Sequence, residues 1–249
     1  SLIRIYSRMV SCSFVAMTCA ATFLFSSLES CATGTCFILF YLSLLRSYQD
    51  KRAPGIAFYS FACLGIASLF FVQILYFVPF LWILMASNMM ALTHRMFWAT
   101  VLGLVMPYWF AVGYYVVTNQ FDAFIDHFAE LAQFEPLLQY EALDIHRIAT
   151  FGLVVLLAVI GIIHYMRNSY QDKIRTRMIF EMFITVDILS FVFIILQPQH
   201  FDNLLPIIIV NTSCLFAHYV ALTRTWLTNV TFIVMCLATL GLTIFNLMP

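Results

Sequence analysis

Long apolar runs separated by short polar segments make up most of the sequence. A helix needs about 20 mostly apolar residues to cross a bilayer, within a range of about 17–25. Nine segments approach that length, so we predict nine membrane-spanning helices. They cover residues 9–28, 30–45, 54–71, 74–92, 96–117, 148–166, 178–196, 204–222 and 228–247. The second and third are short, and the third and fourth nearly touch, so eight spans is the alternative.

The composition agrees with this pattern. The chain has 249 residues, of which 63% are hydrophobic and 10% are charged. Ordinary soluble domains carry about 25% charged residues, so this chain has too few polar side chains to cover a soluble surface. We predict an all-α, polytopic transmembrane helical bundle that forms one integral membrane domain over residues 1–249 within the lipid bilayer. The net charge is zero, and nothing indicates nucleic acid binding.

Charge placement predicts the orientation of the bundle. Lys and Arg concentrate in the cytoplasmic loops of membrane proteins. With nine spans and a cytoplasmic N-terminus, eleven of the twelve Lys and Arg residues fall on the inner side, and only Arg147 falls outside. Most carboxylates fall in the outer segments instead. A wrong number of spans would mix the two sets, so the pattern favours nine spans and a C-terminus on the periplasmic side.

Two short sequences occur twice. SYQDK stands at residues 47–51 and again at 169–173, an offset of 122 positions. ALTHR at 91–95 is echoed by ALTRT at 221–225, an offset of 130. Each copy of SYQDK follows a predicted span on the inner side. Chance similarity between short loops is the alternative to an internal duplication.

The duplication predicts how the spans are grouped. Residues 30–117 and 148–249 would form two parallel four-helix repeats, with residues 1–29 as an extra N-terminal helix. Parallel repeats of this kind occur in transporter folds. Residues 118–147 would connect the repeats on the outer side.

The outer connection has a helical pattern of its own. Apolar residues recur at helical spacing, and Asp122, Asp126 and Glu130 form an acidic stripe at i, i+4. This predicts an amphipathic helix over about residues 120–133 at the outer surface. It would cap the bundle or face a protein partner, and we favour the cap.

The predicted span 178–196 contains two carboxylates. Charge inside a bilayer costs several kcal/mol and often marks a functional site. Asp187 lies near the middle of the span, and Glu181 lies about one turn inside its inner end, where Arg177 can pair with it. The two carboxylates point about 120° apart, so they do not form an acid pair. We expect Asp187 to be protonated or hydrogen-bonded to a neighbouring helix, and both are candidates for binding or coupling.

Polar residues also occur in two other spans. Asn211 and His218 lie in the span 204–222, and Asn88 lies in the span 74–92. The offset of 130 places Asn88 opposite His218, so the two could line one inner cavity. The alternative is that they hydrogen-bond between helices, which is common in membranes.

Histidines give weaker indications. His94, His164 and His218 lie near the inner ends of spans, but no HxxH or HxxxH pair occurs, so we predict no metal site and no cofactor. His200 and Asp202 stand in the outer loop QPQHFDN, either as ligand contacts or in an ordinary turn. No catalytic motif is present, which favours a non-enzymatic protein and leaves an enzyme as an alternative.

The stretches NSYQDKIRTRM, LQPQHFDNLLP and AHYVALT resemble an uncharacterised family of polytopic inner-membrane proteins of Bacteroidota. The resemblance spans most of the chain and implies the bacterial cytoplasmic membrane, but no activity. Some members of the family carry a carotene-oxygenase label. Such an enzyme needs a multi-histidine iron site, which these scattered histidines do not provide.

Three functions fit these observations. The first is binding or transport of a small or lipid-like cell-envelope substrate, which the repeat, Asp187 and the polar span 204–222 favour. The second is a non-catalytic assembly subunit of a larger membrane complex, which the acidic outer helix favours. The third is an intramembrane metal-dependent enzyme, which rests on the histidines alone. We place the first two close together, ahead of the third.

Overall fold

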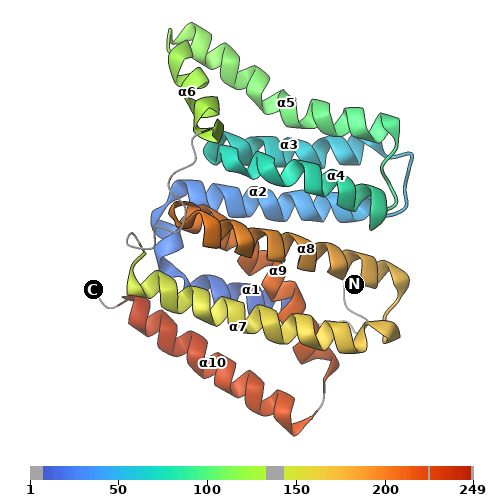
Figure 1. Ribbon diagram of the computed structural model, residues 1–249, viewed down its shortest axis with the longest axis vertical. Coiled ribbons are helices and arrows are strands. Elements are labelled where there is room, and N and C mark those ends of the chain that lie inside the picture. Colours follow the sequence, from blue (N-terminus) through green and yellow to red (C-terminus); the bar gives the residue numbers. More distant parts are fainter. Residues whose placement is uncertain (1–7, 133–142, 224, 248–249) are drawn as a thin grey trace. The chain divides into compact units, whose positions relative to one another are not determined.

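The computed structural model describes residues 8–132, 143–223 and 225–247, and within these ranges the chain is helical with no β-strand (Figure 1). The α-helices are α1 (Met9–Ala20), α2 (Leu28–Leu44), α3 (Pro54–Phe70), α4 (Phe77–Ser87), α5 (His94–Val117), α6 (Phe121–Ala132), α7 (Ile145–Asn168), α8 (Ile174–Leu196), α9 (Phe201–Leu222) and α10 (Trp226–Leu247).

Six helical segments in the described residues are long and apolar enough to cross a membrane. They are Leu28–Ser47, His94–Val117, Ile145–Gln171, Ile174–Leu196, Pro198–Leu222 and Thr228–Leu247. The protein is therefore an all-helical, multi-pass membrane protein, as the sequence predicts at this level.

The other three predicted spans are shorter helices, so nine full spans are not confirmed. Helix α1 has 12 residues and gives way to the 3-10 helix η1 (Thr22–Ser26), because Ala21 leaves the helical region at φ −97° and ψ 57°. Helix α3 has 17 residues. The predicted span 74–92 begins in the 3-10 helix η3 (Val72–Tyr76), and its α-helical part, α4, has only 11 residues.

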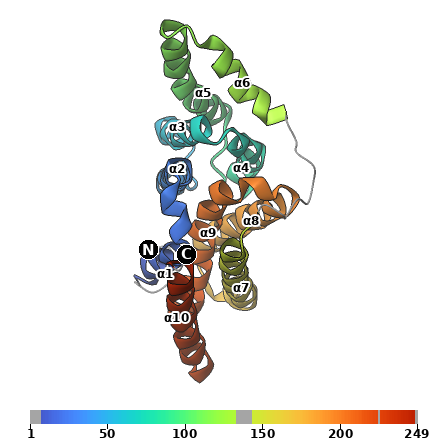
Figure 2. The ribbon, with the colours of Figure 1, turned by 90° about the vertical axis from the view of Figure 1, so that its left-hand side faces the viewer.

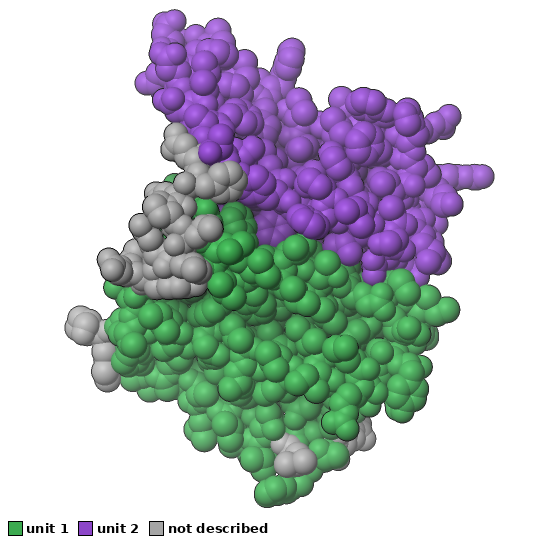
Figure 3. Space-filling view, in the orientation of Figure 1, with its two compact units in different colours: residues 1–31, 138–249 green, residues 32–137 purple. Residues whose placement is uncertain are grey.

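The chain divides into two compact units (Figure 3). Unit 1 comprises residues 1–31 and 138–249, and unit 2 comprises residues 32–137. Helix α2 begins in unit 1 and continues into unit 2. Helix α1, the predicted extra helix, belongs to unit 1.

In unit 2, helices α3 and α5 cross at very short range because a glycine stands on each side of the contact. A Cβ atom at Gly65 would lie 2.6 Å from the carbonyl oxygen of Leu104, and a Cβ at Gly103 would collide with the carbonyl oxygen of Phe58. Small residues at such crossings let helix backbones approach in membranes. The hydroxyl of Tyr108 on α5 donates to Ser68 Oγ on α3 at 2.7 Å.

Helix α6 covers one end of α5 in unit 2. Phe124 and Phe128 contact Tyr108, with ring centroids 6.5 and 5.1 Å away, and His127 Nε2 lies 3.0 Å from the carbonyl oxygen of Ser68. The acidic side chains Asp122, Asp126 and Glu130 are exposed. Residues 133–142 of the predicted outer segment, which include the last position of the predicted helix, lie outside the described residues.

In unit 1, helix α9 occupies the centre and packs against α1, α7 and α8 (Figures 1 and 2). Of the residues in the most apolar part of Pro198–Leu222, which contains α9, 78% are buried, whereas only 6% are buried in the corresponding part of α10. Helix α10 packs on α1 and α7 at the edge of unit 1. Gly161 allows α7 to approach α9, since a Cβ there would lie 2.8 Å from the backbone of Leu215.

Unit 1 has two chemically different ends. One end contains the start of α1 and the α7–α8 and α9–α10 connections, on the right in Figure 1. We call it the basic end, because it carries Arg8, Arg167, Lys173, Arg175 and Arg177. The opposite end carries Asp144 and Asp202 together with Arg147.

Candidate functional site

The central helix of unit 1 buries an unusual set of polar side chains. Asn211, Thr212, Ser213 and His218 of α9 are all buried. Asn211 Nδ2 donates to the carbonyl oxygen of Ile207 at 3.1 Å, and Ser213 Oγ donates to that of Val210 at 2.8 Å. These two side chains therefore satisfy bonds within α9.

Asp187 is fully buried on α8 and faces Thr212 of α9. The Thr212 hydroxyl lies 3.2 Å from Oδ2 and 3.5 Å from Oδ1 of Asp187. None of the ion pairs in the described residues includes Asp187. The expected hydrogen bond to a neighbouring helix is therefore present. Glu181 is half-buried and lies near Tyr165 of α7.

Asp172 and His218 form a second buried polar contact, at the basic end. His218 Nε2 lies 2.8 Å from Asp172 Oδ2, and their side chains are 0% and 1% exposed. Asp172 belongs to the second SYQDK copy. That motif indicates a repeat in the sequence, but its pattern does not mark Asp172 as a site residue.

Helix α7 adds further polar groups beside this pair. The ring of His164 lies 5.6 Å from the ring of His218, measured between centroids, and His164 Nε2 lies 3.0 Å from Thr223 Oγ1. The Tyr165 hydroxyl donates to the carbonyl oxygen of Arg177 at 3.0 Å. We name His164, Tyr165, Asp172, Arg177 and His218 the His218 cluster.

Four buried atoms of this cluster have no hydrogen-bond partner. They are His164 Nδ1, His218 Nδ1, Asp172 Oδ1 and Arg177 Nε. Most buried polar atoms in proteins are paired, and unpaired ones call for an explanation. These atoms of the cluster can therefore still donate or accept hydrogen bonds. The spacing of residues in the sequence did not predict this site.

The remaining predicted site residues lie elsewhere. Asp202 makes a two-bond ion pair with Arg147 at 2.9 Å for each bond, at the end of unit 1 opposite the His218 cluster. His200 is half-buried there, beside the ring of Phe193 at 6.0 Å. In unit 2, Asn88 Oδ1 accepts from the hydroxyl of Ser87, and His94 Nε2 accepts from Trp98 Nε1 at 3.1 Å.

The predicted meeting of Asn88 with His218 would join the two units, and it stays a prediction. The three-histidine alternative has the same difficulty, because His94 lies in unit 2. Only His164 and His218 are brought together in one unit. Across the described residues, no group of three or more His, Cys, Asp or Glu side chains is arranged to hold a metal ion.

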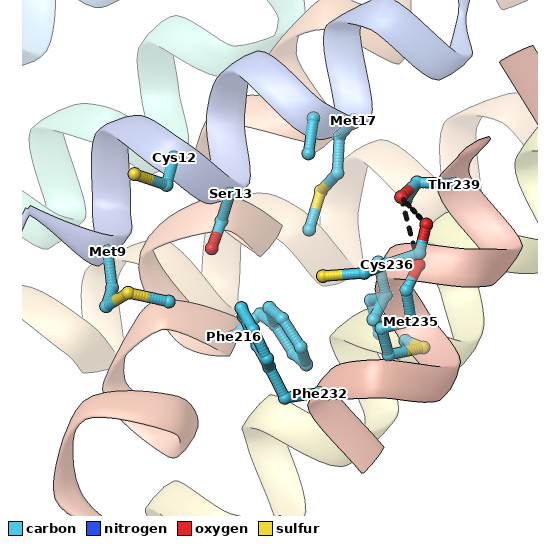
Figure 4. Close-up of a pocket in the computed structure, with 11 residues that line it drawn as sticks. Met9, Cys12, Ser13, Met17, Phe216, Phe232, Met235, Cys236 and Thr239 are labelled. Atoms are coloured by element: carbon cyan, nitrogen blue, oxygen red, sulfur yellow. Dashed lines mark hydrogen bonds between the residues drawn. The ribbon is translucent and has the colours of Figure 1, made fainter. Parts of the chain in front are cut away.

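Unit 1 also contains an apolar cavity of about 220 Å³ between α1, α7, α9 and α10. Figure 4 shows α1 side chains on one side, α10 side chains on the other and Phe216 of α9 between them. Sulfur-bearing side chains make up much of the lining: Met9, Cys12, Met17, Met235 and Cys236. No contiguous motif encodes this cavity, since four separate helices contribute to it.

The cavity offers little polar chemistry to an occupant. The hydroxyl of Thr239 is 3.0 Å from the carbonyl oxygens of Met235 and Cys236, so it bonds to its own helix. Apart from that hydroxyl and Ser13, the lining consists of apolar and sulfur-containing side chains. An apolar molecule therefore suits the cavity better than an ion or a sugar.

No protein-family model matches the chain, and no curated protein or solved structure matches it either. The resemblance to the Bacteroidota inner-membrane family accordingly stays an expectation from the sequence. What can be concluded about function rests on the residues of the two units themselves.

Proposed function

We propose that unit 1 binds a lipid-like molecule of the cell envelope and that the apolar cavity between α1, α7, α9 and α10 holds part of its acyl chain. The single observation that carries this proposal is the cavity and its lining. Binding sites for whole drug-sized molecules measure about 300–1,000 Å³. A cavity of about 220 Å³ is smaller, so it suits a segment of chain rather than an entire lipid.

The side chains that line the cavity can adapt to the shape of an acyl chain. Methionine has a flexible, polarizable side chain and fills irregular gaps, and Met9, Met17 and Met235 all line the cavity. In a bilayer an acyl chain is already in apolar surroundings, so hydrophobic transfer gives no net driving force. Selection for a particular chain would rest on packing contacts.

The bilayer can supply the occupant from the side. Helix α10 has a broad exposed face, with Val234 at 53% and Leu237 at 64%, while Met235 is buried on the side of the cavity. Cys12, Ala16 and Cys236 line the cavity and are themselves exposed. The cavity therefore opens at the surface of unit 1 between two helices with outward apolar faces.

Photo-crosslinking tests binding. Protein in nanodiscs is irradiated with a palmitate analogue that carries a diazirine in mid-chain, and the labelled peptides are sequenced. We expect labelling on α1 and α10 around the cavity. Ala16→Trp fills the cavity and should remove that labelling, whereas Val15→Trp, one residue away at a 56% exposed position, should keep it. Equal labelling of the two variants would contradict the proposal.

Transport is a separate question and needs its own assay. Proteoliposomes with a fluorescent phospholipid in both leaflets are treated with an impermeant quencher. Protein-dependent loss of the protected half of the signal, abolished in Ala16→Trp and retained in Val15→Trp, would indicate movement across the membrane. Labelling without such loss would limit the function to binding.

The duplication and the nine-span topology belong to the same proposal. In unit 2, Gln49 of the first SYQDK copy donates from its backbone nitrogen to the carbonyl oxygen of Met89 at 3.0 Å. In unit 1, Asp172 of the second copy contacts His218. At the offset of 130, Met89 corresponds to Tyr219, the residue after His218, so the two copies contact neighbouring but not identical positions of the proposed repeat. The helix pairs differ, however: α3 packs on α5 in unit 2, while α9 packs on α7 and α8 in unit 1.

We further propose that the basic end of unit 1 faces the cytoplasm of a bacterial cell, with the N-terminus on the same side. Five Lys and Arg residues lie at that end, whereas the other end carries Arg147 together with Asp144 and Asp202, and this difference supports the orientation. In unit 2 the same separation holds between Arg46, Lys51 and Arg52 on the α2–α3 connection and the acidic side chains of α6.

Assembly into a larger complex is the second candidate, favoured by α6. Its aromatic side chains pack on α5, so its acidic side chains point away from unit 2 and remain exposed. A solvated charged face is common, but a row of three carboxylates at i, i+4 also offers a docking surface for a basic partner.

A further inference from the structure

The His218 cluster has a definite hydrogen-bond order, which follows from Thr223. The Thr223 hydroxyl has one proton, and it lies 2.7 Å from the carbonyl oxygen of Tyr219, which can only accept. Thr223 Oγ1 must therefore accept at its other contact, 3.0 Å from His164 Nε2. This places a proton on Nε2 of His164 and leaves Nδ1 of the neutral ring as a lone pair.

The same reasoning applies to His218. Its Nε2 lies 2.8 Å from Asp172 Oδ2 and donates to that carboxylate. Its Nδ1 then carries the lone pair, and this atom is buried without a partner. Two neighbouring imidazoles, 5.6 Å apart between centroids, thus each present an unpaired, proton-accepting nitrogen.

The charges around the rings set the number of protons that can be taken up. The titratable or charged groups that face His218 or its neighbours are Asp172 of the SYQDK loop, Arg177 and Glu181 of α8, His164 and Tyr165 of α7, and Tyr219 of α9, whose ring lies 5.2 Å from that of His164. Helix α1, which also packs on α9, has no His, Asp, Glu, Lys or Arg between Met9 and Ala20.

With both rings neutral, the His218 cluster is formally neutral, and the neighbouring carboxylate of Glu181 brings the formal charge of the cluster and Glu181 together to −1. One added proton brings the formal charge of this set to zero. A second would make it positive and place two cationic rings side by side in an apolar surrounding, which is strongly unfavourable. The cluster therefore suits a single proton that the two rings share.

Access is available from the basic end. His164 and Thr223 are half-buried, whereas Asp172 and His218 are buried. A proton from that side would reach His164 first and His218 next. Asp172 holds the SYQDK loop against α9, so the charge of the rings acts on the contact between this loop and α9.

We propose that His164, His218 and Asp172 form a proton-binding site that exchanges one proton with the compartment at the basic end of unit 1 and thereby links the pH of that compartment to the seating of residues 169–173 on α9. This inference goes beyond the lipid-binding proposal and does not depend on what the cavity holds.

Nitrogen NMR of the full chain in nanodiscs tests the site. The protein is labelled with ¹⁵N at its histidine rings and titrated from about pH 5 to about pH 8. Signals are assigned by comparison with His164→Gln and His218→Gln. We expect His164 and His218 to titrate together and to bind one proton between them, and we expect His164→Gln to move the midpoint of His218 by about one pH unit or more.

Matched controls and a second set of variants complete the test. His94→Gln in unit 2 and His146→Gln at the opposite end of unit 1 should leave the His218 titration unchanged. If His218→Gln does not fold, Asp172→Asn and Thr223→Val keep both rings and should each alter the shared titration. Rings that stay neutral across the range, or that titrate independently with one proton each, would overturn the proposal.

Discussion

The hydroxyl of Thr212 on α9 donates to the buried carboxylate of Asp187 on α8, at 3.2 Å from Oδ2. This bond joins two membrane-spanning helices, and both Thr212 and Asp187 are buried. Removing the donor leaves a buried carboxylate with its main partner lost, and such orphaned groups cost about 1–3 kcal/mol in proteins. Interhelical bonds in membranes average about 0.6 kcal/mol, with a maximum near 1.7.

Thr212→Val should therefore lower the free energy of unfolding by about 1–2 kcal/mol, whereas Thr212→Ser, which keeps the hydroxyl, should cost less. Unfolding in mixed detergent micelles, followed by circular dichroism, measures both. Equal losses for Val and Ser would mean that the hydroxyl contributes nothing to the α8–α9 contact.

Asp187→Asn tests the functional role of the same carboxylate. Asparagine preserves the size of the side chain and can still accept from Thr212, so expression and folding should be normal. If Asp187 takes part in coupling, lipid movement in proteoliposomes should be lost. Movement at the wild-type rate would assign Asp187 to structure alone.

The α3–α5 crossing in unit 2 predicts opposite effects for two Gly→Ala changes on one helix. At Gly103 a new Cβ collides with the backbone carbonyl of Phe58, which cannot move cheaply, so Gly103→Ala should destabilise the protein by about 1–3 kcal/mol. At Gly113 nothing lies within 4 Å of the new Cβ, so Gly113→Ala should be neutral or stabilise by up to about 1 kcal/mol. Thermal unfolding of the two variants in detergent compares them directly, and the same sign for both would refute this packing.

The exposed acidic face of α6 predicts the behaviour of the assembly candidate. Exchanging Asp122, Asp126 and Glu130 for Lys should leave unit 2 folded, because these side chains are exposed. A bound basic partner should then be lost from a mild-detergent purification analysed by mass spectrometry. A variant with Asp122→Asn, Asp126→Asn and Glu130→Gln keeps the size of each side chain without adding positive charge, and so separates loss of attraction from repulsion. A partner that survives both changes binds elsewhere.

The proposed topology predicts on which side the C-terminus lies. With an odd number of spans the termini lie on opposite faces, and with eight or six they lie on the same face. Alkaline phosphatase fused to the C-terminus should be active in the bacterial periplasm and green fluorescent protein fused there should be dark. The reverse result would exclude nine spans with a cytoplasmic N-terminus.

The helical and membranous character of the protein could be predicted from the sequence, because hydropathy is a local property. A run such as residues 178–196 carries its own evidence of burial in lipid, and helix α8 covers it. Local patterns did not predict where a helix stops early. Ala21 and Met90 are apolar, yet the backbone leaves helical geometry at Ala21 and adopts a positive φ of 50° at Met90.

Of the candidate site residues, likewise, one could be identified from the sequence and another could not. Asp187 was identifiable from sequence because a carboxylate in an apolar span is exceptional, and its burial agrees with that reasoning. Asp172 was not, because it stands in a polar loop where a carboxylate is ordinary. Its burial depends on His218, 46 positions later in the chain.

The sequence alone determined that this chain folds into apolar helices and where charge is concentrated. Only the tertiary structure decided that Asp172 meets His218, that Gly103 lies against Phe58 and that four helices enclose a cavity. The physical reason is that hydropathy and helix formation depend on residues within a few turns of each other. A hydrogen-bonded cluster or a cavity depends on distances between side chains that only packing brings together.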